Sequence, residues 1–522
     1  MFGCLVSAAH KSSGKTVVST GLCAALQRRG RAVQPFKKGP DYIDPMWLAE
    51  AAGRACYNLD PYLSTPDELQ RVFARRCAGA DAVVVEGNKG LCDGMSLDGR
   101  DSSAALARTL GLPVVLVLDA RGITRGVAPM LLGLQAFEPG LRWAGVILNR
   151  VAGARHESKL RQAIEHYSDV PVLGALGESA ALSVTERHLG LVPANEQACA
   201  ARCIEAFAES LEASVDMDRL LQRCTVTPVR AGTIDAPASR RHGATAATLG
   251  APRGVADGPV EQSGSIEPGG SIEPGGPTEP GGPVRVAIAR DRAFGFYYPE
   301  DLEALHAAGA VLVPFDALHT PRLPEADALL IGGGFPEVLA ASLQANASLR
   351  HDIRERIEAG LPAYAECGGL MYLARSISWN GTRFDMVGAI PADVLMHARP
   401  VGRGFVHLQE TADAPWPGAA PGAELRGHEF HYSSLRDADP GLRYAYRVVR
   451  GHGVDGERDG IVHHNLLASY SHLRAVAGNR WPWRFVEFVR ARMAASAAAP
   501  ATRARVCVPA PRAVAATDPV TP

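Results

Sequence analysis

The stretch Ala365-Glu366-Cys367-Gly368-Gly369-Leu370-Met371 decides the fold of the second half of the chain. An apolar segment, 360–365, runs into a cysteine that two glycines follow directly. Such a pattern is typical of a strand, a sharp turn and a helix N-terminus that together expose a nucleophile on a strained elbow. The helix N-terminus also favours the thiolate, which is the form of cysteine that attacks. Since a Cys-Gly-Gly triplet also occurs in purely structural turns, the prediction of a nucleophilic cysteine needs support from elsewhere in the chain.

Two further segments of the same half give that support. Ile331-Gly332-Gly333-Gly334-Phe335-Pro336-Glu337 follows the apolar segment 326–331, and a glycine loop at a strand end can present backbone N–H groups to an oxyanion. Far downstream, Leu466-Leu467-Ala468-Ser469-Tyr470-Ser471-His472 ends in a histidine. A cysteine that attacks an amide needs a base that is its neighbour in space, not in sequence. The three segments therefore predict a cysteine–histidine site.

The order of glycine loop, elbow and late histidine resembles the class I (triad-type) glutamine amidotransferases, which release ammonia from glutamine through a cysteinyl thioester. Many of these enzymes carry a glutamate two residues after the histidine, where this chain has Arg474. We therefore expect another group to orient the histidine, or a Cys-His dyad. The resemblance implies a nucleophile, a base and two backbone oxyanion donors, which are Cys367, His472, Gly333 and Gly368.

Length, charge and cysteine content limit the classes of protein to consider. A chain of 522 residues is too long for one core, so we expect two or more domains. A net charge of −1 gives no electrostatic reason to expect nucleic acid or an anionic membrane as partner. We expect no membrane span, because no apolar run reaches ~18 residues. We also expect no signal peptide, because the N-terminus lacks a basic start and a long apolar core. The 10 scattered cysteines form no CxxC pair, which is typical of a reduced, cytoplasmic protein. A homodimer is compatible with the sequence.

Composition divides the chain into two domains, a linker and a tail. Residues 230–283 are rich in Gly, Pro, Ser and Thr and contain three tandem six-residue units, which favours a disordered tether over a peptide-recognition tract. The segment 494–522 is predicted to be a disordered tail for the same reason. The remaining parts, 1–229 and 284–493, alternate strand-like with helix-like patterns. We therefore predict two α/β domains with mainly parallel sheets. The predicted strands include 114–119, 143–149 and 170–176 before the linker and 284–289 and 326–331 after it.

The N-terminal segment 9–16, Ala-His-Lys-Ser-Ser-Gly-Lys-Thr, follows a predicted first strand and precedes a helical pattern. It matches the second half of a phosphate-binding loop, with Ala9 where the first glycine usually stands. Loop amides and the helix N-terminus attract phosphate, the lysine reaches the β- and γ-phosphates, and the threonine hydroxyl reaches Mg²⁺. The residues predicted to bind ATP here are Ser13, Gly14, Lys15 and Thr16.

Two acidic segments lie after neighbouring predicted strands. One is 36–45, which contains Lys37, Lys38, Asp41 and Asp44, and the other is 86–94. A solvated charged loop is the alternative, but such strand ends face the nucleotide crevice of an α/β sheet. Carboxylates there can hold Mg²⁺ and act on transition-state charge. We predict that the carboxylates that act on the metal and on transition-state charge are Asp41, Asp44, Glu86 and Asp93. The candidate ligands of the metal itself are Thr16, Asp41 and Glu86.

Taken in order, several segments resemble the cobyrinic acid a,c-diamide synthase family. They are 12–16, 37–45, 86–91, Asp119-Ala120-Arg121-Gly122, Ile147-Leu148-Asn149-Arg150-Val151, 365–372 and Gly427-His428-Glu429-Phe430-His431-Tyr432-Ser433. The resemblance covers nearly the whole chain outside the linker and tail. It implies an N-terminal P-loop NTPase-like domain of the dethiobiotin synthetase type and a C-terminal glutamine amidotransferase domain.

The resemblance also implies a reaction and its substrates. Mg-ATP would activate the a- and c-carboxylates of cobyrinic or hydrogenobyrinic acid as acyl phosphates, and ammonia from glutamine would convert them to amides in cobalamin biosynthesis. The family further implies ATP contacts at His10, Asn149 and Pro193, catalytic roles for Asp41, Asp44 and Glu86, and substrate contacts at Tyr42 and Asp93. Lys37, Lys38 and Lys89 lie on the same loops and are candidates for holding ring carboxylates of the substrate, with a solvated surface as the alternative.

Three other functions fit parts of the sequence. The same chemistry on sirohydrochlorin or siroheme differs only in the ring, and the residues do not decide between the rings. A P-loop maturation or partitioning ATPase would need no thiol, and a non-catalytic amidotransferase-like module would need neither Cys367 nor His472. Because two domains would share ammonia, we also expect a sealed path between the cysteine elbow and the acidic loops.

Overall fold

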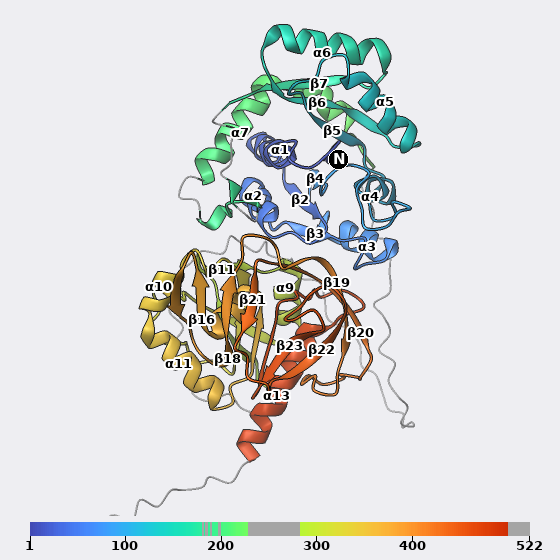
Figure 1. Ribbon diagram of the computed structural model, residues 1–522. Coiled ribbons are helices and arrows are strands. Elements are labelled where there is room, and N and C mark those ends of the chain that lie inside the picture. Colours follow the sequence, from blue (N-terminus) through green and yellow to red (C-terminus); the bar gives the residue numbers. More distant parts are fainter. Residues whose placement is uncertain (180–181, 183–185, 188–189, 197–199, 228–281, 499–522) are drawn as a thin grey trace, which may run out of the picture.

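The computed structural model describes the chain outside residues 180–181, 183–185, 188–189, 197–199, 228–281 and 499–522 (Figure 1). Two domains lie one above the other, the N-terminal one ending with helix α8 (Met217–Arg223) and the C-terminal one beginning with strand β10 (Val284–Ala289). Nearly all of the predicted linker and most of the predicted tail lie outside the described residues. The last helix, α13 (Trp481–Ala498), continues past Ala494, where we expected the tail to begin.

The N-terminal domain is built on one seven-stranded sheet of order β3-β2-β4-β1-β5-β6-β7, in which every strand pair is parallel. Strands of such a sheet are covered on both faces and therefore read as continuous apolar runs, as in 82–85. The strands are β1 (Phe2–Ala8), β2 (Val33–Lys38), β3 (Tyr57–Leu59), β4 (Ala82–Glu86), β5 (Val114–Asp119), β6 (Trp143–Val151) and β7 (Val172–Gly177).

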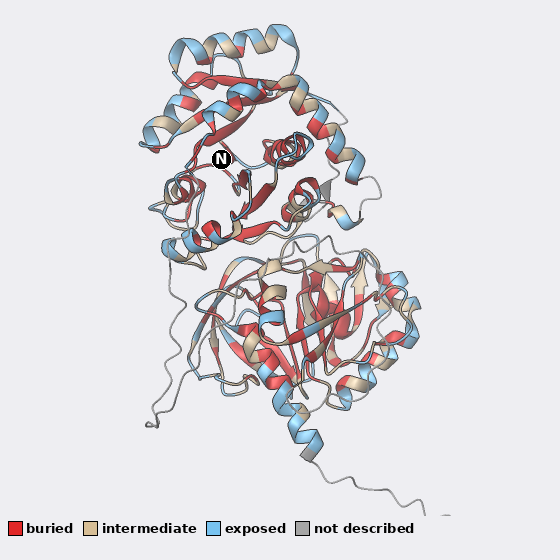
Figure 2. Cartoon of the chain, turned by 180° about the vertical axis from the view of Figure 1, so that it is seen from behind, coloured by how far each residue is buried: buried red, intermediate tan, exposed pale blue. Residues whose placement is uncertain are grey.

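Helices cover both faces of this sheet and bury it between two cores (Figure 2). Helices α1, α2, α7 and α8 pack on one face, where Leu22 of α1 is fully buried, and α3 to α6 pack on the other, where Leu160 of α6 is fully buried. The helices are α1 (Lys15–Arg28), α2 (Ile43–Ala52), α3 (Pro66–Arg76), α4 (Ser103–Leu110), α5 (Val127–Phe137), α6 (Ala154–Tyr167) and α7 (Ala200–Ser214). The loops that follow β1, β2 and β4 meet at one edge of the sheet.

The C-terminal domain contains a nine-stranded sheet of order β12-β10-β13-β15-β24-β23-β22-β19-β20. The first five strands are parallel, and every pair from β24 onward is antiparallel, so the expectation of a mainly parallel sheet holds for only half of it. The other strands are β12 (Ala310–Phe315), β13 (Ala328–Ile331), β15 (Ala363–Glu366), β19 (Gly402–Glu410), β20 (Glu424–His431), β22 (Arg443–Arg450), β23 (Arg458–His463) and β24 (Leu466–Ser469).

Smaller elements complete this domain. A four-stranded sheet, β17-β16-β18-β21, and a two-stranded ribbon, β11-β14, flank the main sheet. These strands are β11 (Phe294–Phe296), β14 (Gly333–Gly334), β16 (Ala374–Trp379), β17 (Thr382–Asp385), β18 (Ile390–Met396) and β21 (Ser433–Arg436). The helices before α13 are α9 (Pro299–Ala307), α10 (Ala340–Ala345), α11 (Ala347–Glu358) and α12 (Gly368–Leu373). None of the helices that the structure describes has both the length and the apolar character of a membrane span.

Strand β3 and helix α3 lie on the side of the N-terminal domain that faces the C-terminal domain (Figure 1), and polar contacts join the two domains there. Tyr57 donates a hydrogen bond of 2.6 Å to Glu303 of α9, and Arg76 donates one of 2.9 Å to the same carboxylate. Arg474 of the C-terminal domain donates 2.9 Å to the carbonyl of Asn58. These bonds hold the two domains so that the carboxyl ends of the parallel strands in one sheet face those in the other sheet.

Candidate active site

Cys367 lies on a sharp elbow between β15 and α12. Its φ of 47° and ψ of −100° are outside the regions that side chains other than glycine normally adopt, so the backbone is strained at this residue. Two backbone hydrogen bonds keep Cys367 in this conformation. Its amide donates a bond of 2.7 Å to the carbonyl of Ser469, and its carbonyl accepts one of 3.0 Å from the amide of Met371. The side chain is only 7% exposed. The structure thus has the elbow that the sequence predicts.

The two glycines after Cys367 are required by close packing. A Cβ atom at Gly369 would run into the carbonyl oxygen of Ile331 at the end of β13, and one at Gly368 would lie 2.9 Å from the amide nitrogen of Gly334. Any side chain at these positions would push α12 away from the neighbouring strand. The glycine pair therefore lets the elbow sit directly against the glycine loop.

His472 reaches Cys367 because their strands are neighbours. β15 pairs in parallel with β24, with Glu366 opposite Ser469, and the chain then continues three residues to the histidine. The carboxyl ends of parallel strands meet at the same sheet edge, which brings nucleophile and base together. Gly333 packs against the ring, since a Cβ there would lie 2.7 Å from Cε1 of His472. Gly334 lines the cavity beside Cys367.

Glu366 is the carboxylate that orients His472, and the sequence interpretation missed it. Its Oε2 lies 3.3 Å from Nδ1 of the histidine, while its Oε1 accepts 2.6 Å from the Tyr364 hydroxyl and 2.9 Å from the Leu473 amide. The residue directly before the cysteine thus takes the place of the glutamate usually found after the histidine. Arg474, at that later position, binds Glu300 and the other domain instead.

The electrostatic setting keeps His472 protonated. Burial by itself lowers the pKa of the imidazole, but hydrogen bonds and charges from Cys367 and Glu366 outweigh it and raise the pKa to about 10. An imidazolium beside a thiol stabilises the thiolate. The geometry therefore suits a thiolate–imidazolium pair whose histidine is held by a carboxylate at its other nitrogen.

Replacing Glu366 with glutamine should lower glutamine hydrolysis by about 100-fold and move the alkaline limb of the pH profile downward from about pH 10. The pKa of His472 is raised, so protonation persists until pH reaches that value and is lost earlier once the carboxylate charge is removed. Glutamate release measured against pH tests this. Tyr364→Phe is the control, because it removes a hydrogen-bond partner of Glu366 but leaves the charge of Glu366 in place. The alkaline limb of this variant should therefore stay where it is in the parent. An unchanged alkaline limb in Glu366→Gln would contradict the role of Glu366 in orienting His472.

The phosphate-binding loop joins β1 to α1 with the geometry that the motif predicts. Gly14 precedes the helix with φ 89°, and Lys15, the first residue of α1, is 7% exposed. Burial and the nearby charge of Lys37 lower the pKa of Lys15. Thr16 donates 3.0 Å to Oε1 of Glu86 at the end of β4. A lysine and a threonine thus stand at a helix N-terminus next to a carboxylate.

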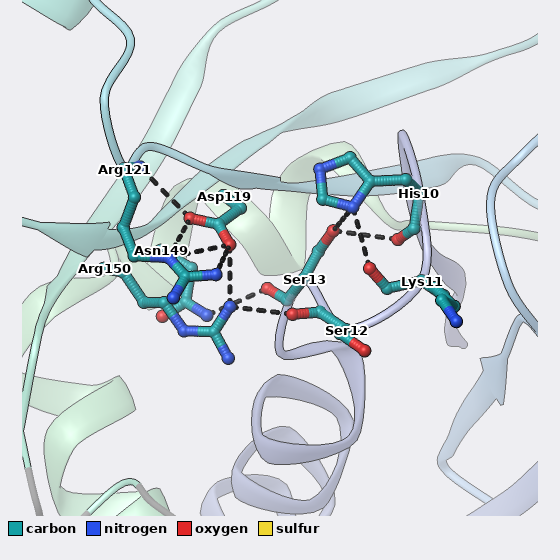
Figure 3. Close-up of polar contacts among 8 residues, drawn as sticks. All are labelled: His10, Lys11, Ser12, Ser13, Asp119, Arg121, Asn149 and Arg150. Carbon is teal, nitrogen blue, oxygen red and sulfur yellow. Dashed lines mark hydrogen bonds and ion pairs between the residues drawn. The ribbon is translucent and has the colours of Figure 1, made fainter.

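Side chains from β5 and β6 hold this loop in place (Figure 3). The Asn149 amide donates 2.9 Å to the Ser13 carbonyl, and Arg150 donates 2.7 Å to the Ser12 carbonyl and 2.7 Å to Asp119. Within the loop, Ser13 donates 2.8 Å to the carbonyl of His10, whose ring is exposed. Asn149 was predicted to contact ATP, and its amide supports the loop directly. Pro193, another predicted ATP contact, is buried.

The predicted acidic cluster exists, but Lys37 occupies its centre. The Lys37 Nζ lies 2.8 Å from Glu86 and 3.8 Å from Asp41 and forms an ion pair with Asp44, and its side chain is 2% exposed. The hypothesis that Lys37 holds ring carboxylates is therefore wrong, because the ammonium is buried and already paired. Burial and Asp44 raise the pKa of Asp41 to about 7.

The residues next to the phosphate loop fit one Mg²⁺ ion. Oε2 of Glu86 is buried without a hydrogen-bond partner among the described residues, and Thr16 stands beside this carboxylate. Asp41 uses Oδ1 to accept the amides of Ile43 and Asp44, and its Oδ2 lies 3.8 Å from Nζ of Lys37. The described residues contain no cluster of three or more His, Cys, Asp or Glu that could bind a metal alone. Mg²⁺ is usually held by one or two carboxylates together with substrate phosphates, and the Glu86, Asp41 and Thr16 oxygens fit such a site.

Replacing Lys37 with methionine should destabilise the N-terminal domain by about 3–5 kcal/mol, because buried carboxylates would lose their cation. Hydrogen exchange of peptides that cover β4 measures the opening free energy of this region. The double variant Lys37→Met/Asp44→Asn should recover part of the loss, since it removes one of the unpaired charges. Equal protection of β4 in the parent and the single variant would contradict the structural role.

One cavity of about 310 Å³ opens between the domains and touches both groups of residues. Cys367 and His472 line it from the C-terminal domain and Asp41 from the N-terminal domain. The four residues predicted to contact the substrate all line it: Lys38, Tyr42, Lys89 and Asp93. Lys89 is exposed, whereas burial lowers the pKa of Lys38 against the attraction of Asp60 and Asp101. The sites of the two domains therefore share one space.

The fold and these two sites define a glutamine amidotransferase joined to a P-loop nucleotide-binding domain. In agreement, residues 285–480 match the CobB/CobQ-like glutamine amidotransferase domain and residues 6–192 match the CobQ/CobB/MinD/ParA nucleotide binding domain. A cobyrinate a,c-diamide synthase of Magnetococcus marinus is 44% identical over 93% of this chain and 97% of its own length. One of Methanosarcina acetivorans is 38% identical over 91% and 92%. The chain belongs to the cobyrinate a,c-diamide synthase family.

Two solved structures resemble part of the chain. The structure of PurLQS from Thermotoga maritima is 15% identical and covers 41% of this chain and 99% of that chain, with a TM-score of 0.31. A structure titled glutamine amidotransferase is 19% identical and covers 39% of this chain and 98% of that chain, with a TM-score of 0.29. Scores this low support no conclusion about this chain.

Proposed function

We propose that this protein amidates the a- and c-carboxylates of cobyrinic acid or hydrogenobyrinic acid in cobalamin biosynthesis, with ATP and with ammonia from glutamine. A carboxylate is a poor electrophile, so ATP would convert it to an acyl phosphate, which ammonia attacks to give the amide, ADP and phosphate. The observation that carries this proposal is the cavity shared by Cys367 and Asp41. It would let ammonia pass between the two sites without entering solvent, where it is protonated.

In the glutaminase half-reaction, the Cys367 thiolate would attack the side-chain amide carbon of glutamine. The backbone amides of Gly333 and Gly368 would stabilise the oxyanion. His472, held through Nδ1 by Glu366, would then protonate the amide nitrogen so that it leaves as ammonia, and water would hydrolyse the thioester to glutamate.

In the activation half-reaction, the amides of loop 9–14 and Lys15 would bind the phosphates of ATP, with nucleotide contacts at His10, Ser13, Asn149 and Pro193. Thr16, Glu86 and Asp41 would hold Mg²⁺, which neutralises phosphate charge when bound. Asp44 fixes Lys37 beside these groups. In-line transfer depends mainly on positioning and charge, and these residues provide both.

The acceptor would lie in the shared cavity. Lys38 and Lys89 supply cations for peripheral carboxylates of a tetrapyrrole, while Tyr42 and Asp93 face the same space. Cytoplasmic localisation and homodimer formation stay predictions of the sequence.

A panel of rings tests the proposal. The purified protein is given Mg-ATP and glutamine with cobyrinic acid, hydrogenobyrinic acid or sirohydrochlorin, and mass spectrometry counts the carboxylates converted to amides. Two amidations on a cobyrinic or hydrogenobyrinic ring are the expected result. Amidation of sirohydrochlorin alone would reassign the ring, and ATP hydrolysis without amidation of any ring would contradict the proposed reaction.

A further inference from the structure

A tyrosine of the nucleotide-binding domain contacts the histidine of the glutaminase site. The Tyr42 hydroxyl lies 3.1 Å from Nδ1 of His472, although 430 residues separate them in sequence. The same nitrogen faces Oε2 of Glu366 at 3.3 Å. The atom that orients the catalytic ring therefore has one partner from each domain.

Aromatic packing fixes the Tyr42 ring, so the contact does not depend on a freely rotating side chain. The ring stacks on Phe296 with centroids 5.2 Å apart and planes within 4°. Tyr298 lies 4.4 Å away and His428 lies 5.7 Å away, between centroids. All three neighbours belong to the C-terminal domain, so Tyr42 is inserted into a pocket of aromatic side chains beside His472.

A protonated His472 has one hydrogen on Nδ1, and both the Tyr42 oxygen and Oε2 of Glu366 lie within reach of it. On its other side, the Tyr42 ring packs against Tyr298, whose hydroxyl lies 3.5 Å from Nδ1 of His428. Burial, His472 and Arg474 lower the pKa of His428, which favours a neutral ring beside Tyr298. The Tyr42 oxygen therefore acts with Glu366 to orient Nδ1 of His472.

The position of Tyr42 is set by the turn that also carries the acidic cluster. Asp41 accepts the amides of Ile43 and Asp44 at 3.0 and 3.1 Å, which closes the turn, and Asp44 pairs with Lys37. Tyr42 stands between these two carboxylates in the chain. The contact to His472 is thus rigidly attached to the site where ATP and acceptor would react.

We propose that Tyr42 is a positioning residue of the glutaminase site: its hydroxyl holds Nδ1 of His472, so ammonia is produced at the full rate only when the nucleotide-binding domain is docked with this turn in place. This inference rests on the proposed hydrolysis of glutamine at Cys367. It adds to Tyr42 a role toward the other domain that is separate from contact with the acceptor.

The test compares Tyr42→Phe with Tyr57→Phe in the full chain. Each variant removes one tyrosine hydroxyl that bonds to the C-terminal domain, but the partner of Tyr57 is Glu303 and not the histidine. We expect Tyr42→Phe to lower kcat for glutamate release by about tenfold or more, with KM for glutamine unchanged, because a hydrogen bond to a charged group is lost. Two rates are measured against pH in Tyr42→Phe: glutamate release, and covalent labelling by a diazo-ketone analogue of glutamine. In both profiles the alkaline limb should move to lower pH. Tyr57→Phe should match the parent, and in Tyr42→Phe the loss of glutamate release should exceed any loss of ammonia-supported amidation.

Three results would overturn the inference: a parental kcat and pH profile in Tyr42→Phe, an equal loss in Tyr57→Phe, or an equal loss with ammonia as the nitrogen source. The last would assign Tyr42 to the acceptor instead. If the parent itself released no glutamate, the proposed function would fail and this inference with it. A defect restricted to Tyr42→Phe in an active parent is the supporting outcome.

Discussion

Replacing Cys367 with alanine should abolish amidation supported by glutamine and leave amidation supported by ammonia close to the parental rate. The thiol lies on the strained elbow of the C-terminal domain and belongs to the ammonia source, whereas carboxylate activation uses residues of the other domain. Without the sulfur no thioester can form, and the oxyanion donors alone give a small residual rate. The loss with glutamine should therefore be larger than that of any other single substitution in this domain.

Amide formation on the ring, followed by mass spectrometry with either nitrogen source, measures both rates in one preparation. Cys203→Ala is a matched control, because this half-buried cysteine lies on α7 in the other domain. It should behave as the parent does. Glutamine-dependent turnover that survives in Cys367→Ala would remove the cysteine from its assigned role, and loss with both nitrogen sources would show a defect in folding or docking.

Replacing Lys15 with alanine should stop the reaction with either nitrogen source, by about 10³-fold, because both routes need the activated carboxylate. The ammonium stands at the N-terminus of α1 beside Thr16 and Glu86, where developing phosphate charge would lie. Glutamate release without acceptor should persist, since the glutaminase residues are untouched. This pattern is the reverse of that expected for Cys367→Ala.

ADP formation measured with acceptor and ammonia gives the activation rate directly. Lys11→Ala is the matched control, because Lys11 is an exposed lysine of the same loop. It removes an equal charge from the loop but not from the helix N-terminus. A loss confined to glutamine-supported amidation in Lys15→Ala would mean that this lysine does not act in carboxylate activation.

The sequence predicts best those residues whose role is set by local backbone geometry. Cys367 and Gly14 lie in short segments where a strand, a turn and a helix follow one another, and the structure has the expected turn at both. The parallel strands were predictable for a related reason, because each is a continuous buried run such as 114–119. The antiparallel half of the C-terminal sheet was not predicted, since pairing of β19 with β22 depends on residues far apart in sequence.

The missed residues act through contacts that the sequence does not encode locally. Glu366 is the last residue of an otherwise apolar strand, and a carboxylate in that position was the one available signal. Lys37 is the same case, since a lysine inside the fully buried strand β2 must have partners. Tyr42 reaches His472 only because the two domains dock, which no pattern within either domain reveals.

With Lys37 seated among Asp41, Asp44 and Glu86, the N-terminal domain contains its own counter-cation. Sites built only from carboxylates repel themselves when their metal is withdrawn, and many such domains unfold in chelators. Here the ammonium neutralises part of that repulsion whether or not Mg²⁺ is present. Storage in a chelating buffer should therefore suspend the reaction without lowering the melting temperature, and returning magnesium should restore the activity without refolding.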